Sequence, residues 1–156
     1  MSRLSFVAQD LSDTDRLGAT LAQVLPASSV VSLVGTLGAG KTYLVQSLAS
    51  ALGVARESVV SPTFVLCQEY QGSKKIVHVD AYRLHDEDEF LELGPQEWFE
   101  SEGLTLIEWA DRVESCLPVE RLEIRIEVLP ADARQFEMHA IGGSMVAALD
   151  ALRASL

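Results

Sequence analysis

The fold is decided by the stretch VVSLVGTLGAGKT at residues 30–42. Its last eight residues fit the pattern G-x-x-x-x-G-K-[ST] at every fixed position. The apolar run that precedes them, Val30–Val34, predicts a buried strand. After the loop, apolar residues recur at helical spacing as far as Gly53, which is a suitable helix stop. Strand, loop and helix in this order are the context that a phosphate-binding loop requires.

The loop carries a specific chemistry. Its glycines allow the backbone to curl so that several N–H groups face one phosphate, and the following helix adds the positive end of its dipole. Lys41 is expected to reach the β- and γ-phosphates, and Thr42 is expected to place its hydroxyl on Mg²⁺. The predicted phosphate-binding residues are Gly35, Thr36, Leu37, Gly38, Ala39, Gly40, Lys41 and Thr42.

Length and composition favour one folded domain over residues 1–156. The chain has 156 residues and 48% hydrophobic content, enough for one core. No apolar stretch approaches a membrane span, and the first residues lack a signal-peptide core. A cytoplasmic location with no membrane association is therefore expected. In that compartment the two cysteines, Cys67 and Cys116, are expected to be free thiols.

The charge balance bears on partners. A net charge of −11 argues against autonomous nucleic-acid binding, which needs a basic footprint. The only evident basic cluster, Lys74-Lys75, is predicted to lie in a solvated hairpin turn. If the biology involves a nucleic acid, we expect a partner protein to hold it.

The rest of the chain alternates between strand and helix patterns. These patterns predict an α/β fold of three layers, P-loop NTPase-like, with a mainly parallel central sheet and antiparallel additions. The expected strands are 5–8 (at an edge), 65–70 and 75–79 (a hairpin), 104–107, and 121–128 with 136–140 (a second hairpin). One expected helix starts within residues 12–15 and ends at Pro26. Three others are expected over residues 86–93, 95–99 and 145–156.

Two carboxylates follow apolar strands. Asp80 follows Ile76–Val79, and Glu108 follows Leu104–Ile107. Because the carboxyl ends of parallel strands meet at one edge, both acids are expected beside the loop. Hydrolysis or transfer needs such groups for Mg²⁺ and for orienting the attacking oxygen, but the pattern leaves open which acid meets the metal. His78 is interpreted as a hydrogen-bonded core histidine.

Several segments together resemble the TsaE family. Its members are small bacterial P-loop ATPases needed to make N6-threonylcarbamoyladenosine (t6A) in tRNA. The resemblance rests on the loop and on Ser61-Pro62-Thr63-Phe64, His78-Val79-Asp80-Ala81-Tyr82-Arg83-Leu84 and Ile107-Glu108-Trp109, and it extends from about residue 14 to Arg134. The loop is generic, whereas the combination at this spacing is specific.

The resemblance implies roles for matching residues. Lys41 is the phosphate lysine, Thr42 and Glu108 are the Mg²⁺ pair, and Asp80 is the second essential carboxylate. Arg134 is implied to frame the base pocket. ATP and Mg²⁺ are the implied cofactors.

The resemblance also implies partners. These are the proteins TsaB and TsaD, which themselves handle the tRNA, so that ATP hydrolysis powers turnover of their complex. Thr63 and residues 80–94 are implied to be switch-like elements near the γ-phosphate. Thr36 departs from the family, which usually has Asp there, and this removes a charge from the loop. The expected activity is a slow intrinsic ATPase.

Two other functions share the loop and the acids. A small-molecule kinase would need an acceptor pocket and usually an arginine-bearing lid, but the stretch after Asp80 is acidic. A non-catalytic switch would bind ATP and hydrolyse it incidentally. Analysis of the reaction products distinguishes a kinase from an ATP hydrolase. A Glu108→Ala variant distinguishes a non-catalytic switch from an ATP hydrolase.

Overall fold

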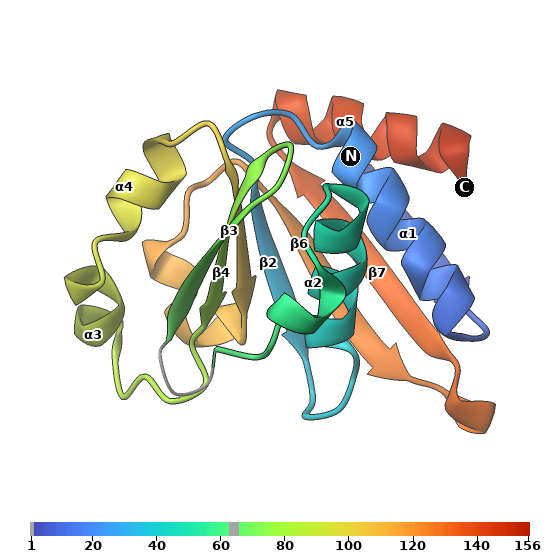
Figure 1. Cartoon of the computed structure of the whole chain (residues 1–156), viewed down its shortest axis with the longest axis horizontal. Helices are drawn as coiled ribbons and strands as arrows, with labels where there is room; N and C mark the ends of the chain where they lie inside the picture. The colour runs from blue at the N-terminus through green and yellow to red at the C-terminus, as the bar shows by residue number, and fades with distance from the viewer. Residues whose placement is uncertain (1, 63–65) are drawn as a thin grey trace.

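The computed structural model describes residues 2–62 and 66–156, and its centre is a seven-stranded sheet of order β1-β7-β6-β2-β5-β4-β3 (Figure 1). The four central strands β6, β2, β5 and β4 are parallel, whereas β1, β7 and β3 pair antiparallel. The predicted α/β architecture is thus confirmed, including the edge position of β1. The strands are β1 (Ser2–Ala8), β2 (Val30–Gly35), β3 (Cys67–Gln71), β4 (Lys75–Asp80), β5 (Leu104–Glu108), β6 (Arg121–Val128) and β7 (Arg134–Ile141).

Helices lie against both faces of the sheet. The α-helices are α1 (Leu11–Val24), α2 (Lys41–Ala51), α3 (Glu87–Glu92), α4 (Pro95–Glu100) and α5 (Gly143–Ser155). Short 3₁₀ helices are η1 (Arg56–Ser58), η2 (Ala110–Cys116) and η3 (Pro130–Asp132). Figure 1 shows α1 and α2 side by side, with α3 and α4 at the opposite end of the sheet. Within the described residues, no helix has the length and apolarity needed to cross a bilayer.

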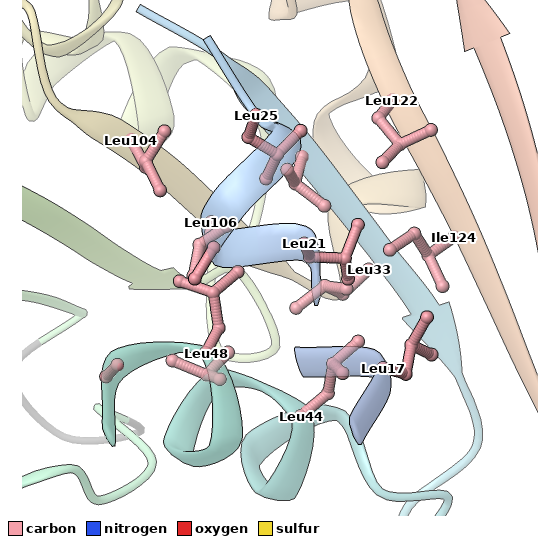
Figure 2. Packing of buried hydrophobic residues seen from close by; sticks show 14 of the residues in the cluster. Leu17, Leu21, Leu25, Leu33, Leu44, Leu48, Leu104, Leu106, Leu122 and Ile124 are labelled. Carbon is pink, nitrogen blue, oxygen red and sulfur yellow. The ribbon is translucent and has the colours of Figure 1, made fainter. Parts of the chain in front are cut away.

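Strand alternation divides the core into two clusters. In β2, Val31 and Leu33 join the cluster under α1, α2 and α5, whereas Val30 joins the cluster under α3, α4 and η2. The first cluster is seen in Figure 2, where leucines of α1 and α2 meet those of β2 and β5. Leu17 and Leu21 are four residues apart, so they share one face of α1, and Leu25 is the C-cap residue that follows the helix. Each buried leucine stabilises the fold by about 1.5–3 kcal/mol.

Two local predictions were wrong. Helix α1 begins at Leu11 with Asp10 as its N-cap, before the expected Ser12–Asp15 start. Lys74 lies in the turn between β3 and β4, but its side chain does not extend into solvent. Its ammonium donates to the carbonyls of Ala22 and Leu25 at 3.2 and 3.0 Å. Lys75 lies in β4 and pairs with Glu69 at 3.1 Å. Both lysines therefore have partners within the fold.

Asp15 joins α1 to α2 and η1. Its carboxylate accepts hydrogen bonds from Ser47 and Arg56, each at 2.7 Å, and from the Tyr43 hydroxyl at 3.2 Å. Burial opposes ionisation of this carboxyl, but the three hydrogen bonds outweigh it and hold the pKa of Asp15 below its usual value. A depressed carboxyl pKa stabilises the fold above the unfolded pKa, and this stabilisation is lost as the pH falls through the folded pKa.

We therefore expect Asp15→Asn to lower the free energy of unfolding at pH 7 by about 1 kcal/mol, since the side chain is 45% exposed. The difference from wild type should begin to shrink as the pH falls below the unfolded pKa of about 3.9, and it should be lost as the pH falls through the lower folded pKa, where the wild-type carboxyl is protonated as well. Urea unfolding of both proteins at pH 7 and pH 3 measures this difference. An equal difference at the two pH values would contradict the role of the charge.

Cys67 and Cys116 are free thiols, as predicted. Burial, with a contribution from Glu69, raises the pKa of the Cys67 thiol to about 11. At pH 8 only about one thiolate per thousand is then present. In a Cys116→Ser protein we expect Cys67 to react with Ellman's reagent about two orders of magnitude more slowly in the native state than in urea, where its pKa is ordinary. Equal rates would show that the thiol is not protected.

Candidate functional site

The loop between β2 and α2 has the backbone shape that its glycines permit. The Ala39 N–H donates to the Thr36 carbonyl at 3.0 Å and closes a tight turn. Gly40 precedes the first turn of α2 with φ +111°, a conformation that L side chains rarely adopt. A Cβ on Gly35 would lie 2.8 Å from the Ile126 carbonyl oxygen of β6. Glycine is therefore required at position 40 for the backbone turn of the loop and at position 35 for close packing against β6.

Lys41 reaches back over this loop. Its buried ammonium donates to the carbonyls of Gly35 and Thr36 at 2.6 and 2.8 Å. Thr36 accepts this bond through its backbone carbonyl. The contact with Lys41 therefore does not depend on whether residue 36 is Thr or Asp. Burial lowers the pKa of Lys41, while the carboxylates of Glu108 and Asp80 oppose this effect. Among the described residues these carbonyls take two of its three N–H donors, which leaves one for an anion.

Both predicted carboxylates lie at this end of the sheet, because Asp80 of β4 and Glu108 of β5 are register partners. The Thr42 hydroxyl donates to Glu108, with its oxygen 2.9 and 3.0 Å from the two carboxylate oxygens. Asp80 accepts from the Ser61 hydroxyl at 3.0 Å and from the Tyr82 backbone N–H at 2.8 Å. Glu108 is thus next to the hydroxyl of Thr42, whereas Asp80 faces the segment that precedes β3.

A cavity of about 410 Å³ opens beside these groups. It is lined by the loop and the start of α2, by both carboxylates, and by Ser61, Tyr82 and Trp109. Lys41, Thr42, Asp80 and Glu108 therefore surround one space. A larger hollow of about 480 Å³, among Arg3, Glu123 and Arg125 on the sheet face, has mixed charge and lacks a loop of this kind. Thr63 lies outside the described residues.

The sequence alone leaves open whether Trp109 packs over the site or sits in the core, and the structure places it at the cavity. The Lys41 ammonium lies 4.2 Å from the ring centroid of Trp109, within the range of a cation–π contact. Trp109 also packs against Tyr82, with the ring centroids 4.8 Å apart and the rings tilted by 48°, and the Arg112 guanidinium lies 5.2 Å from the Tyr82 ring. Trp109 has φ +59°, which is uncommon for a bulky residue and places its ring at the cavity. The sequence feature that pointed to this placement is that Trp109 directly follows Glu108.

His78 is a core histidine, as interpreted from the sequence, but it contacts the site directly. Its Nε2 lies 2.6 Å from Glu108 Oε2. The sequence contained one indication that His78 lies at the site. His78 and Asp80 are two residues apart in one strand, so their side chains share a face of the sheet.

Arg134 lies beside the loop but does not line the cavity that contains Asp80 and Glu108. Its guanidinium donates to the Ala39 carbonyl at 2.9 Å and pairs with Asp132 at 2.9 Å. It lines a separate hollow of about 230 Å³, together with Asp10 and Thr14. A role in framing a base pocket stays a prediction.

The donor set at Thr42 and Glu108 fits Mg²⁺. Within residues 2–62 and 66–156, no group of three or more His, Cys, Asp or Glu side chains could hold a metal ion. Mg²⁺, however, is usually bound through one or two protein oxygens together with phosphate oxygens and water. The hydroxyl of Thr42 and the carboxylate of Glu108 supply hard oxygen donors at the start of α2, next to the loop.

The strand–loop–helix unit, with a lysine, a threonine and two strand-end carboxylates around one cavity, defines a P-loop fold. Within this class, residues 8–136 match the family model described as "Threonylcarbamoyl adenosine biosynthesis protein TsaE". The chain belongs to the TsaE family.

Two curated relatives bear the name tRNA threonylcarbamoyladenosine biosynthesis protein TsaE. The protein from Treponema pallidum is 40% identical over 129 residues, which cover 83% of this chain and 95% of the relative. The protein from Bacillus subtilis is 37% identical over 143 residues, covering 91% and 89%. A crystal structure of Bacillus subtilis YdiB superposes with a TM-score of 0.83 at 29% identity, covering 98% of this chain and 95% of that one.

Proposed function

We propose that this protein binds Mg–ATP at the Gly35–Thr42 loop and hydrolyses it, and that hydrolysis drives turnover of a TsaB–TsaD complex that forms t6A in tRNA. The observation that carries the proposal is the convergence of Lys41, Thr42, Asp80 and Glu108 on one cavity beside the loop. The names of the relatives supply the pathway.

Each residue has a distinct task in this proposal. The backbone N–H groups of the loop and the remaining N–H of Lys41 bind phosphate oxygens and stabilise the charge that builds up during transfer. Thr42 and Glu108 would hold Mg²⁺, which would neutralise phosphate charge when bound. Asp80, fixed by Ser61 and the Tyr82 backbone, orients the attacking water. Tyr82 and Trp109 line the cavity, where their rings would limit the entry of bulk water.

The surface around the cavity supports a protein partner. Three apolar side chains there are well exposed: Leu37 by 78%, Val60 by 57% and Tyr82 by 40%. Leu37 and Tyr82 line the cavity, and Val60 precedes Ser61, which also lines it. Exposed apolar residues gathered at one place mark interaction sites. The net charge of −11 favours an arrangement in which the partner, not this chain, contacts the tRNA.

The proposed pathway is tested by replacing the TsaE gene of a bacterium with the gene for this protein. Nucleoside analysis of its tRNA measures t6A. We expect wild type and Lys75→Ala, a surface lysine away from the cavity, to restore t6A, and Lys41→Ala and Glu108→Ala to fail. Restoration by Glu108→Ala would favour a non-catalytic switch. In purified protein, release of free phosphate in an amount equal to the ADP formed distinguishes hydrolysis from transfer to a metabolite.

A further inference from the structure

A chain of buried polar groups leads from the loop into the sheet. It runs from the Thr42 hydroxyl to Glu108, then to His78 and on to Tyr70. Glu108 Oε2 lies 2.6 Å from His78 Nε2, and the Tyr70 hydroxyl lies 3.3 Å from His78 Nδ1. Tyr70, His78 and Glu108 come from the adjacent strands β3, β4 and β5, and all three are buried.

We propose that His78 is a positioning residue, which holds the Glu108 carboxylate toward Thr42 by an Nε2–H hydrogen bond. Tyr70 fixes this arrangement by occupying the other ring nitrogen. The inference rests on the proposed function, because the position of Glu108 matters only if Thr42 and Glu108 serve a bound nucleotide.

Counting hydrogens gives the direction of each bond. The Thr42 hydroxyl has one hydrogen and donates it to Glu108, whose ionised carboxylate can only accept. The 2.6 Å contact therefore needs the ring hydrogen on Nε2 of His78. With the single ring hydrogen on Nε2, Nδ1 is an acceptor for the hydrogen of the Tyr70 hydroxyl. The Nε2–H tautomer therefore satisfies the contacts from Thr42 to Tyr70.

Tyr70 also lies near the segment before β3. Its hydroxyl oxygen is 3.5 Å from the Val60 carbonyl oxygen, but a hydroxyl that donates its single hydrogen to Nδ1 cannot also donate to this carbonyl. Val60 precedes Ser61, whose hydroxyl donates to Asp80. His78 is therefore bonded to Glu108 directly, and its other ring nitrogen faces Tyr70.

Two substitutions separate positioning from packing. A glutamine at 78 can present its amide N–H near the place of Nε2, whereas an asparagine reaches only the place of Nδ1. We expect His78→Asn to raise the half-saturating Mg²⁺ concentration and lower kcat by about 10- to 100-fold, with a smaller change in KM for ATP, and His78→Gln to stay within about threefold of wild type. Equal losses in the two variants would overturn the proposal, because packing alone would then explain them.

The second readout needs neither activity nor a change at residue 78. In a His85→Gln/His139→Gln protein, His78 is the single histidine, because the chain has three. Ring ¹⁵N NMR shifts of this ligand-free protein report the tautomer, and we expect Nε2–H. The Nδ1–H tautomer, or averaging between the two, would overturn the proposal even if a residue-78 variant fails to fold. If the wild type hydrolyses no ATP, the proposed function fails, whereas the tautomer still decides the hydrogen-bond arrangement.

Discussion

Lys41→Ala is expected to reduce the rate of ATP hydrolysis by about 100- to 1,000-fold. The ammonium is buried, with one N–H donor left after its bonds to Gly35 and Thr36. In the proposed mechanism its loss removes the charge that stabilises phosphate in the transition state, and it also removes two bonds within the loop. Phosphate release at saturating Mg–ATP measures the effect.

The matched control is Lys75→Ala, which removes a surface lysine paired with Glu69 at 3.1 Å. Its rate should equal that of wild type. Thermal unfolding of both variants shows whether the loop lysine also contributes to stability. A Lys41→Ala protein that keeps more than about a tenth of the wild-type rate would show that the charge is not used in the transition state.

Glu108→Gln is expected to lower kcat by about 100-fold while KM for ATP changes much less. The substitution keeps the shape of the side chain, so the hydrogen bonds of Thr42 and His78 retain an oxygen acceptor. It removes the negative charge that supports Mg²⁺ and the neighbouring Lys41. Hydrolysis measured across a Mg²⁺ titration should show a higher half-saturating concentration.

Glu114→Gln makes the same chemical change on an exposed side chain and should leave the rate unchanged. If Glu108→Gln loses nucleotide binding and kcat stays near wild type, Glu108 contributes to ground-state binding only, and its assigned role is wrong.

Most of the fold could be predicted because its signals are local. The alternation of Leu122, Ile124 and Ile126 with charged residues predicts β6 with one buried face, and the structure buries those three side chains. The start of α1 could not be fixed in the same way. Asp10 and Ser12 both precede the helical pattern and both can cap, and only the bond from the Asp13 N–H to Asp10 selects one. Lys74 was misjudged because its carbonyl partners lie about 50 residues away in α1 and after it.

The candidate site shows the same division. Asp80 and Glu108 could be predicted to meet because parallel strands bring their carboxyl ends to one edge. Which acid lies next to Thr42 depends on side-chain direction, which periodicity does not encode, and the structure places Glu108 there. The contact between His78 and Glu108 was missed because an apolar strand pattern shows only that a polar residue is buried, and its partner comes from another strand.

The central claim is that this chain hydrolyses ATP at the loop on behalf of its partner complex. The most direct measurement is steady-state ATP hydrolysis by this protein alone and with purified TsaB and TsaD, with Lys41→Ala as the blank. We expect a slow rate for the protein alone, a higher rate with both partners, and neither rate in the variant. A rate that the partners leave unchanged, or that survives in Lys41→Ala, would contradict the account.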